Sequence, residues 1–251
     1  MLPEERRNLI VSYVDSHNTA TVQELTDALD SSAATIRRDL LVLQEENRIN
    51  KVFGGATSLG FKSVNAIEPS VSEKAMLNLK EKNLIAEYAA SLIQDDDFVY
   101  IDSGTTTLCL VDHITNTKAR YITNGIVHAK HLLERGLSTM IIGGRVKPVT
   151  EAIIGSYCVD ALSRLHFTKA FMGTNGISLV AGFSTPDVDE ALVKSEAIKH
   201  AYAAYVLADH SKFEVISSVT FSNLWDCSVI TDTMPDKKFT EQTIVKVVAQ
   251  E

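Results

Sequence analysis

Residues 32–40 read Ser-Ala-Ala-Thr-Ile-Arg-Arg-Asp-Leu and predict a helix with one apolar and one cationic face. At about 100° per residue, four apolar side chains fall along one stripe: Ala33, Ile36, Leu40 and Leu43. Arg37 and Arg38 point away from that stripe. The stripe can therefore pack on a small core while two guanidinium groups remain available for phosphates or guanine edges. This pattern is typical of a DNA-reading helix, although an Arg-Arg pair taken alone is also explained by a solvated helix surface.

Two shorter helical patterns precede this one. Residues 3–17 carry apolar side chains at helical spacing, with Pro3 suited to the first turn. Thr21 and Glu24 form a capping box, in which each side chain can satisfy the other residue's free N–H group at the start of a second helix. Residues 30–32 are Asp-Ser-Ser and can cap the third helix after a tight turn. The second and third helices predict a helix-turn-helix.

The stretch after the third helix alternates like a strand. It covers residues 49–53 and ends at Gly54-Gly55, which permits the positive φ angles of a sharp turn. A strand and a turn at this position predict a wing.

The charge of this region is not that of a strongly basic DNA-binding protein. Residues 1–57 contain six Lys or Arg against nine Asp or Glu, within a chain of net charge −8. Without a general basic footprint, DNA binding is expected to be strongly salt-dependent and to need more than one subunit on a palindromic site.

Residues 5–57 resemble the winged helix-turn-helix domain of the DeoR family of bacterial sugar-metabolism repressors. The specific part is Thr35-Ile-Arg-Arg-Asp-Leu40 followed by Gly54-Gly55-Ala56. The resemblance implies double-stranded operator DNA as a partner, read by residues in the major groove and by one lysine on the wing. These residues are Ser32, Thr35, Arg37, Arg38 and, on the wing, Lys51.

The rest of the chain is long enough for one further domain of ordinary size. The chain has 251 residues, of which 45% are hydrophobic, and can bury a sizeable core. It contains no run of about 18 apolar residues and no signal peptide. Cys109, Cys158 and Cys227 lie far apart without a C-x-x-C or His-Cys cluster, so free thiols are expected. We expect a cytoplasmic protein without a membrane anchor, metal or cofactor.

Strand and helix patterns alternate through this second part. Residues 58–72, with a single Pro69, have the composition of a connecting segment. Helix-length segments such as 187–202 separate most of the short strands expected at 98–102, 120–124, 139–143, 170–173, 204–208 and 228–232. The alternation predicts a mainly parallel, Rossmann-like α/β sheet with helices on both faces. The expected organisation is a winged helix-turn-helix domain at 1–57, a linker at 58–72 and an α/β effector domain at 73–251.

Small polar residues follow several of the expected strands. In a parallel α/β sheet, ligands bind outside the carboxyl ends of the strands. Residues 102–107, Asp-Ser-Gly-Thr-Thr-Thr, follow a strand and open a helix, so free N–H groups and hydroxyls meet at a spot that suits a phosphate. Four further strands end in polar loops, at 123–125, 143–144, 173–176 and 209–212. Each loop alone is explained as an ordinary turn or helix cap, but together they favour a phosphorylated sugar or polyol as the ligand.

The resemblance to the DeoR family extends through this part, on residues 72–74, 78, 81–82, 102–107, 173–176 and 209–212. It implies an effector domain whose fold is similar to that of ribose-phosphate isomerase. By the same resemblance, this effector domain binds a phosphosugar inducer. By this resemblance, residues 102–107 cradle the phosphate or neighbouring hydroxyls, Lys212 and Lys82 pair with phosphate charge, and Asp209 holds the sugar. A helical lysine is otherwise a solvated charge, and an ion pair between Lys212 and Asp209 would also explain both residues.

The candidate effector-binding residues share a place at the expected rim of the sheet. They are Asp102, Ser103, Gly104, Thr105, Thr106, Thr107, Thr123, Asn124, Gly143, Gly144, Gly173, Asn175, Gly176, Asp209, Lys212 and Lys82. Residues 123–129, 142–147 and 150–155 are similar to the fructose-operon repressor branch of the family, which implies fructose 1-phosphate as the effector. We expect a homodimer or homotetramer whose DNA affinity falls when the ligand binds, although the opposite sign stays open.

Two other classes of function remain as alternatives. A sugar-phosphate isomerase could use Asp187, Asp189 or Glu190 as a base, but Pro186 followed by acids is also ordinary helix-start chemistry. An architectural DNA-binding protein would leave the polar loops without a purpose. We therefore expect a regulator and not an enzyme. The histidines show no ligand spacing, so no metal site is expected.

Overall fold

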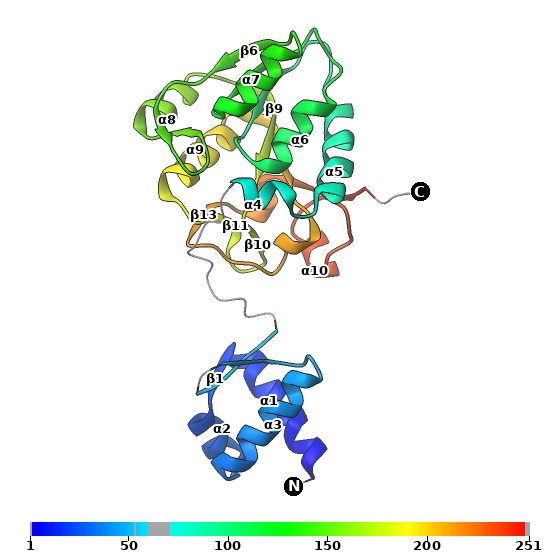
Figure 1. Cartoon of the computed structure of the whole chain (residues 1–251), viewed down its shortest axis with the longest axis vertical. Coiled ribbons are helices and arrows are strands. Elements are labelled where there is room, and N and C mark those ends of the chain that lie inside the picture. Colours follow the sequence, from blue (N-terminus) through cyan, green and yellow to red (C-terminus); the bar gives the residue numbers. More distant parts are fainter. Residues whose placement is uncertain (1, 53, 60–70, 249–251) are drawn as a thin grey trace. The chain divides into compact units, whose positions relative to one another are not determined.

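The computed structural model describes residues 2–52, 54–59 and 71–248 (Figure 1). Its contacts divide the chain into two compact units, Met1–Ser63 and Val64–Glu251. The division falls inside the connecting segment expected at residues 58–72, most of which, with Pro69, lies outside the described residues. The limits at 57 and 73 therefore stay predictions.

The smaller unit combines helices with a small antiparallel sheet of strand order β1-β3-β2. Its described elements are α1 (Pro3–His17), β1 (Thr19–Thr21), α2 (Val22–Leu29), α3 (Ala33–Glu45), β2 (Asn50–Val52) and β3 (Gly55–Thr57). The strand expected at 49–53 is present as β2, and Phe53 at its end lies outside the described residues. Gly54 has a φ of +83°, which provides the sharp turn between β2 and β3.

Side-chain caps decide where α2 and α3 begin. The Thr21 N–H donates to Glu24 Oε2 at 2.7 Å and the Glu24 N–H donates to Thr21 Oγ1 at 3.1 Å, which is the expected capping box. Ser32 Oγ accepts from the Thr35 N–H at 3.2 Å and caps α3. The chain reverses at Asp30, which has a φ of +43°. The helix-turn-helix is confirmed.

The core of the smaller unit confirms the apolar stripe of α3. Ile36, Leu40 and Leu43 are at most 1% exposed and pack with residues of α1 and α2, while Ala33 is partly buried. Because the stripe is buried, α3 must turn its other face outward.

In the described part of the larger unit, seven parallel strands form one sheet of order β15-β14-β12-β9-β4-β5-β6. The strands are β4 (Phe98–Ile101), β5 (Arg120–Thr123), β6 (Ser138–Ile141), β9 (Phe167–Gly173), β12 (Ala201–Leu207), β14 (Ser228–Thr231) and β15 (Val245–Val247). All six expected strands are present, and β15 is additional. The expected parallel α/β sheet is confirmed.

The remaining strands form smaller antiparallel units that the sequence reasoning missed. They are the hairpin of β7 (Arg145–Lys147) and β8 (Ala152–Ile154), and the sheet of β10 (Gly176–Ser178), β11 (Gly182–Thr185) and β13 (Val219–Ser222).

The helices of the larger unit lie on both faces of the parallel sheet (Figure 1). They are α4 (Val71–Met76), α5 (Leu79–Ser91), α6 (Thr105–His113), α7 (Ile126–Glu134), α8 (Ser156–Leu162), α9 (Val188–Lys199) and α10 (Lys237–Thr240), with 3-10 turns at His210–Lys212 and Leu224–Asp226. The helix expected to reach residue 202 ends at Lys199, because Ala201 already pairs with Phe167 in the sheet.

Alternation along the strands divides the core into two layers. Val99 and Ile101 of β4 pack in the cluster that contains residues of α5 and α6, whereas Tyr100 packs in the cluster that contains residues of α8 and α9. The chain runs from β4 outward to β6 on one side and then resumes at β9 on the other side of β4. The order thus reverses between β4 and β9, and such a switch point is where parallel sheets open a ligand crevice.

Candidate functional site

The outward face of α3 carries two uncommitted cations. Arg37 and Arg38 are exposed, and within the described part of the chain neither makes a hydrogen bond or an ion pair. The next residue, Asp39, is only 6% exposed and accepts from Arg6 Nε at 2.6 Å. The carboxylate beside the two arginines therefore faces inward and is neutralised by α1, so it does not oppose an anion approaching α3.

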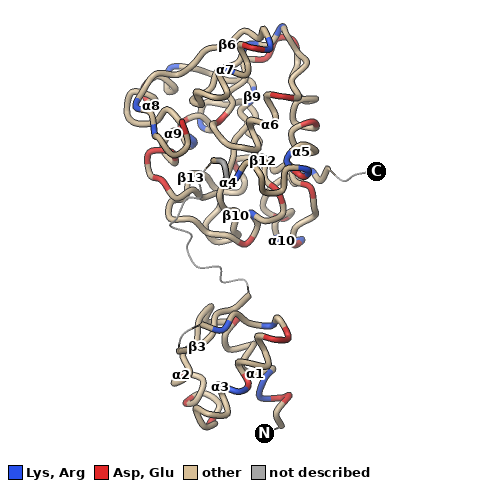
Figure 2. Tube along the Cα trace, in the orientation of Figure 1, with Lys and Arg blue, Asp and Glu red and all other residues tan. Residues whose placement is uncertain are grey.

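The other candidate DNA contacts lie at the amino end of α3 and on the wing. Ser32 is exposed, and its hydroxyl lies 2.9 Å from the Thr35 hydroxyl at the first turn of the helix. Lys51 is exposed on β2. Figure 2 shows basic and acidic positions mixed over the smaller unit, without a continuous basic face. The surface can contact phosphates at a few points, which agrees with the absence of a general basic footprint.

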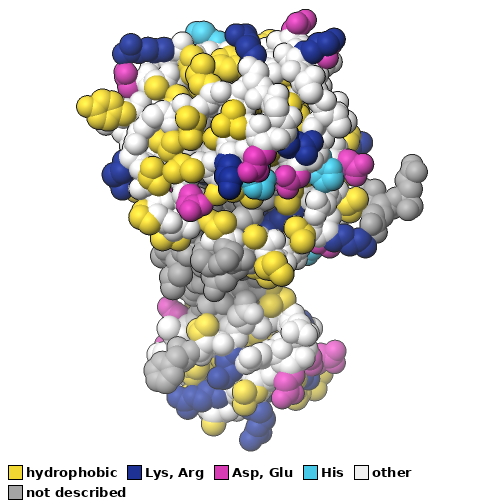
Figure 3. Space-filling model, turned by 45° about the horizontal axis from the view of Figure 1, so that its top comes forward, with side chains coloured by type: hydrophobic (Ala, Val, Ile, Leu, Met, Phe, Trp, Pro, Cys, Tyr) yellow, Lys and Arg dark blue, Asp and Glu magenta, His cyan; other side chains and the backbone are white. Residues whose placement is uncertain are grey.

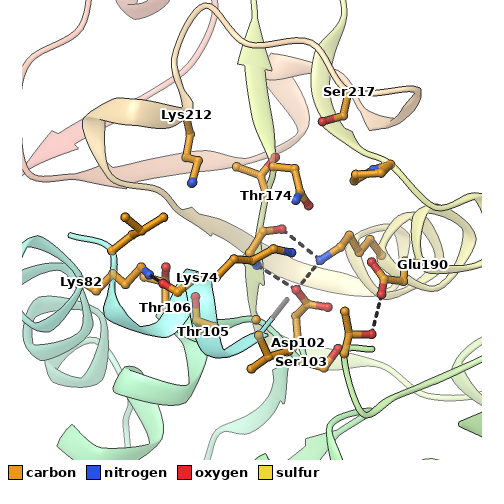
Figure 4. Close-up of a pocket in the computed structure, with 18 residues that line it drawn as sticks. Lys74, Lys82, Asp102, Ser103, Thr105, Thr106, Thr174, Glu190, Lys212 and Ser217 are labelled. Atoms are coloured by element: carbon orange, nitrogen blue, oxygen red, sulfur yellow. Dashed lines mark hydrogen bonds and ion pairs between the residues drawn. The ribbon is translucent and has the colours of Figure 1, made fainter. Parts of the chain in front are cut away.

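A pocket opens at the switch point of the larger unit (Figure 4). Its floor is Asp102, directly after β4, which is 1% exposed. Asp102 Oδ2 accepts from the Gly173 N–H at 2.9 Å, at the end of β9, and from Lys194 Nζ on α9. Lys194 Nζ also donates to Gly173 O at 3.0 Å. A buried carboxylate oxygen that accepts from a cation and from an N–H group is fixed in place, so this floor is a preorganised element.

One wall of the pocket is cationic. Lys74, Lys82 and Lys212 line it together with the first turn of α6, and Figure 4 shows these lysines near Thr105 and Thr106. Lys82 is 3% exposed and donates to Lys74 O. Burial lowers the pKa of Lys82, and the Asp209 charge opposes that shift. Lys212 is half-buried, and its ammonium group has no partner among the described residues. An anion entering here meets positive charge and free helix N–H groups.

The loop that opens α6 is held by its own side chains. Thr107 Oγ1 lies 2.9 Å from the Gly104 N–H and 2.8 Å from Gly104 O. His128, buried on α7, lies with Nε2 2.9 Å from Gly104 O and 3.2 Å from Thr107 Oγ1. Burial lowers the pKa of His128 to about 4, although the hydrogen bond to Gly104 opposes the shift. The neutral ring therefore fixes the loop without adding charge.

The opposite wall is acidic and joins the β7–β8 hairpin. Glu190 is 7% exposed and accepts from Thr150 Oγ1 at 2.9 Å and from Lys147 Nζ at 3.1 Å. Lys147 also pairs with Asp187 at 3.2 Å, and Arg145 pairs with Asp189. These contacts attach the hairpin to the start of α9. Figure 4 shows Glu190 across the pocket from Lys82 and Lys74, so the two walls differ in charge.

The pocket brings together nine of the sixteen candidate effector residues. They are Lys82, Asp102, Ser103, Gly104, Thr105, Thr106, Gly173, Asn175 and Lys212. Seven lie outside its lining: Thr107, Thr123, Asn124, Gly143, Gly144, Gly176 and Asp209.

The seven have structural partners or positions that explain their placement. Thr107 braces the loop described above. Thr123 Oγ1 accepts from the Gly125 N–H at 3.0 Å, and Asn124 Nδ2 donates to Ile153 O at 3.1 Å. Asp209 Oδ1 accepts from Asn78 Nδ2 at 2.9 Å and from the Ser211 N–H at 3.0 Å, and Asp209 forms no ion pair with Lys212, which is also among the described residues.

The three glycines among the seven are set apart for other reasons. A Cβ on Gly176 would meet Val215 O at 2.3 Å, so that glycine allows close packing of backbone. Gly143 and Gly144 are exposed before β7.

Several lining residues were not predicted. They are Val71, Lys74, Leu77, Thr150, Thr174, Pro186, Glu190, Lys194 and Ser217, although Lys74 and Thr174 lie in the stretches 72–74 and 173–176 that carry the family resemblance. Glu190 and Lys194 are four residues apart on α9 and both buried. Two charged residues at this spacing on a helix face that is otherwise buried could have indicated these two lining residues from the sequence.

The acids considered for catalysis have structural roles. Asp187 caps α9 by accepting from the Glu190 N–H at 2.9 Å. Burial would raise the pKa of Asp187, but this hydrogen bond and Lys147 lower it overall. The described residues contain no cluster of metal-ligating side chains and no helix with the length and apolarity to cross a membrane.

Comparison with known proteins gives the family. Residues 6–60 match the DeoR-like helix-turn-helix domain, and residues 77–233 match the DeoR C terminal sensor domain. An uncharacterized HTH-type transcriptional regulator, FruR of Bacillus subtilis (strain 168), is 44% identical over 99% of this chain and 99% of the relative. The lactose phosphotransferase system repressor of Staphylococcus aureus (strain NCTC 8325 / PS 47) is 30% identical over 99% of this chain and 100% of the relative.

Among solved structures, ribose 5-phosphate isomerase A from Methanocaldococcus jannaschii matches with a TM-score of 0.41 and 14% identity over 54% of this chain and 55% of that chain. The HTH-type transcriptional repressor GlcR of Bacillus subtilis (strain 168) is 33% identical over 95% of this chain and 92% of the relative. These sequence relatives are named as regulators and repressors, and the chain is a non-enzymatic DNA-binding regulator. With both family domains matched and relatives aligned along its whole length, the chain belongs to the DeoR family of transcriptional regulators.

Proposed function

We propose that this chain represses a sugar-utilisation operon in the cytoplasm as a homo-oligomer, and that a phosphorylated sugar releases it from its operator. The foremost candidate for that sugar is fructose 1-phosphate. Support for a sugar-phosphate comes from the two unlike walls of the pocket. Lys74, Lys82, Lys212 and the α6 amino end suit a phosphate, while Glu190, Asn175 and Thr150 on the other side suit hydroxyl groups.

The proposed ligand orientation follows from charge. The phosphate lies at the lysine wall, with Ser103, Thr105 and Thr106 as further donors. The sugar hydroxyls extend toward Glu190, whose carboxylate accepts hydrogen bonds but repels a phosphate. The preference for a fructose derivative is supported by the resemblance of residues 123–129, 142–147 and 150–155 to the fructose-operon repressor branch.

In this proposal the residues that contact operator DNA are Ser32, Thr35, Arg37, Arg38 and Lys51. A dimer places two copies of α3 in successive major grooves of a palindromic site. We call the helix-turn-helix unit the head. Ligand binding favours an arrangement of subunits in which the two heads no longer match the spacing of the two half-sites on the DNA. Operator affinity then falls by the coupling free energy, commonly about 1–3 kcal/mol, or about 5- to 150-fold.

The test is a fluorescence anisotropy titration of the protein on DNA from upstream of its own gene. Fructose 1-phosphate should lower the affinity, whereas fructose without phosphate should leave it unchanged. The same titration with fructose 6-phosphate and glucose 6-phosphate measures how strongly the effect on DNA affinity depends on the position of the phosphate. If no phosphorylated hexose changes DNA affinity, and calorimetry detects no heat of binding with any of them, the effector assignment is wrong.

Varying the salt concentration adds a second test to the same experiment. The logarithm of the DNA affinity should fall linearly with the logarithm of salt concentration, with a slope near the number of phosphates contacted. A slope near zero would contradict guanidinium–phosphate contacts. Binding of the sugar-phosphate should depend on salt less, because Lys82 is buried and Lys74 and Lys212 are half-buried.

A further inference from the structure

The two edges of the parallel sheet differ in charge. β15 ends one side and β6 ends the other. The central residue of β15 is Lys246, which is exposed and lies 4.9 Å from the centre of the Tyr88 ring. Residues 136–144, which contain β6, read Gly-Leu-Ser-Thr-Met-Ile-Ile-Gly-Gly and carry no charge. Because charged side chains on an edge strand discourage pairing with another chain, β15 is protected and β6 is open.

Apolar side chains cluster at this open edge. Met140 and Ile141 of β6 are 51% and 46% exposed, and Leu133 on α7, which packs against β6, is 63% exposed. β6 lies at the top of Figure 1, and Figure 3, which brings that top forward, shows hydrophobic side chains spread over the surface facing the viewer. We call Leu133 and β6 together the β6 edge. Because successive side chains of a strand point to opposite faces of the sheet, Ile141 lies on the face that α7 covers and Met140 lies on the other face. The β6 edge therefore exposes apolar surface on both faces of the sheet, and exposed apolar surface at an unpaired edge marks an interaction site.

The backbone of β6 is available for hydrogen bonding. Among the described strands, only β5 pairs with β6. The Ile142 N–H donates to Thr123 O at 3.0 Å on the β5 side. Since peptide groups alternate in direction along a strand, Thr139 and Ile141 direct their N–H and C=O groups away from β5. A further strand can therefore extend the sheet at this edge through main-chain hydrogen bonds.

We propose that the β6 edge is the contact between two copies of this chain, with their β6 strands paired antiparallel across a twofold axis. The inference rests on the proposed function, which requires paired heads. A twofold axis brings each residue near its own copy, so a strand without charge avoids the repulsion that two like charges would cause. This self-complementarity favours a second copy over a partner of different chemistry.

The helix beside β6 has charges that fit the same arrangement. Lys130 and Glu134 on α7 are exposed and lie 3.7 Å apart. Two α7 helices that run antiparallel with the twofold axis between these two residues would place each lysine opposite the glutamate of the other copy. The rim of the contact is then polar and electrostatically complementary around an apolar centre, as in stable interfaces.

The test uses the full-length chain and two substitutions at the β6 edge. Met140→Lys places a charge beside its own copy. Ile141→Pro removes an outward N–H group and leaves the hydrogen bonds to β5 in place, as prolines on edge strands do. Ile244→Lys is the matched control, because Ile244 is 74% exposed beside β15. Sedimentation velocity over a range of concentrations should show dimer affinity at least tenfold lower for both β6 variants and unchanged for the control.

The possible outcomes separate this interface from the rest of the proposed function. Circular dichroism melting verifies that each variant is folded. The inference is overturned if both β6 variants stay dimeric, if only Ile244→Lys dissociates, or if the unchanged chain is monomeric. Calorimetry with fructose 1-phosphate on Met140→Lys should show unchanged affinity, since the substitution lies outside the pocket. Loss of the dimer with unchanged operator affinity would support the interface but contradict the need for two subunits on DNA.

Discussion

The two cationic regions of this chain present their charges in opposite ways. Arg37 and Arg38 are exposed, and within the described residues nothing pairs with them, whereas Lys82 and Lys194 are 3% and 6% exposed and donate to protein oxygens. Solvated guanidinium groups can meet a long polyanion at little desolvation cost, but salt screens them. Buried ammonium groups are fixed in place and are screened much less. The comparison predicts that the head and the pocket respond differently to substitution, pH and salt.

Substitution in the head should give the largest effect. In the proposed function Arg38→Ala removes one groove contact per subunit, worth about 1–3 kcal/mol each, so a dimer should lose roughly 2–6 kcal/mol of operator binding. Anisotropy with operator DNA measures this loss. Fructose 1-phosphate affinity should be unchanged. Arg7→Ala is the control, because Arg7 pairs with Glu46 elsewhere in the head. A parallel loss of DNA and sugar-phosphate binding would mean that Arg38 supports folding.

Breaking the pocket floor should act mainly on stability. Lys194→Met leaves the buried Asp102 carboxylate without its cation and should lower the free energy of unfolding by about 3–5 kcal/mol. Urea denaturation measures the change. Lys199→Met, on the same helix and 70% exposed, should have little effect. Similar stability of the two variants would show that the floor is not preorganised as described.

Low pH should reduce the stability of the larger unit through His128. Its pKa is lowered from 6.5 to about 4 by burial, so the unfolded chain binds more protons between these values. Stability should therefore be full above pH 6.5 and fall as the pH drops toward 4, by on the order of 3 kcal/mol. In His128→Gln, an amide can still donate to Gly104 O, and this slope should flatten. An unchanged slope in thermal or urea unfolding would remove His128 as its source.

Replacement of Lys212 in the pocket should have the smallest effect of the four substitutions. Lys212→Ala should weaken fructose 1-phosphate binding by about 1.5–3 kcal/mol, because it deletes a charged donor to the phosphate. Stability and operator affinity without ligand should change little, since Lys212 is half-buried and has no partner among the described residues. Calorimetry measures the first and anisotropy the second. Normal release by the effector would place Lys212 outside the site.

The head could be predicted almost completely from sequence because its signals are local. The capping box of Thr21 and Glu24, the Ser32 cap and the α3 stripe each involve residues within a few turns of one another, and all three are present. The β1 strand was missed, since its pairing with β3 joins residues 19–21 to residues 55–57 across the whole head. Local patterns do not encode that distance.

The pocket could be predicted only in part because its side chains come from distant elements. The rule that ligands sit beyond strand ends found Asp102 and Gly173, which meet at 2.9 Å although they are 71 positions apart. The same rule also selected Asn124 and Gly143, which follow β5 and β6 away from the β4–β9 switch point and lie outside the pocket lining. Lys194 and Glu190 were missed because they reach the pocket from the middle of a helix, where the rule does not look.

Glu190 belongs at once to the wall of the pocket and to the attachment of the β7–β8 hairpin. A carboxylate offers about four lone-pair positions, and Thr150, Lys147 and Thr185 already lie within reach of its two oxygens. A hydroxyl group that enters the pocket and donates to Glu190 would take the remaining position, on the same carboxylate that holds the hairpin. One buried side chain would then join whatever fills the cavity to the segment that carries Lys147 and Thr150.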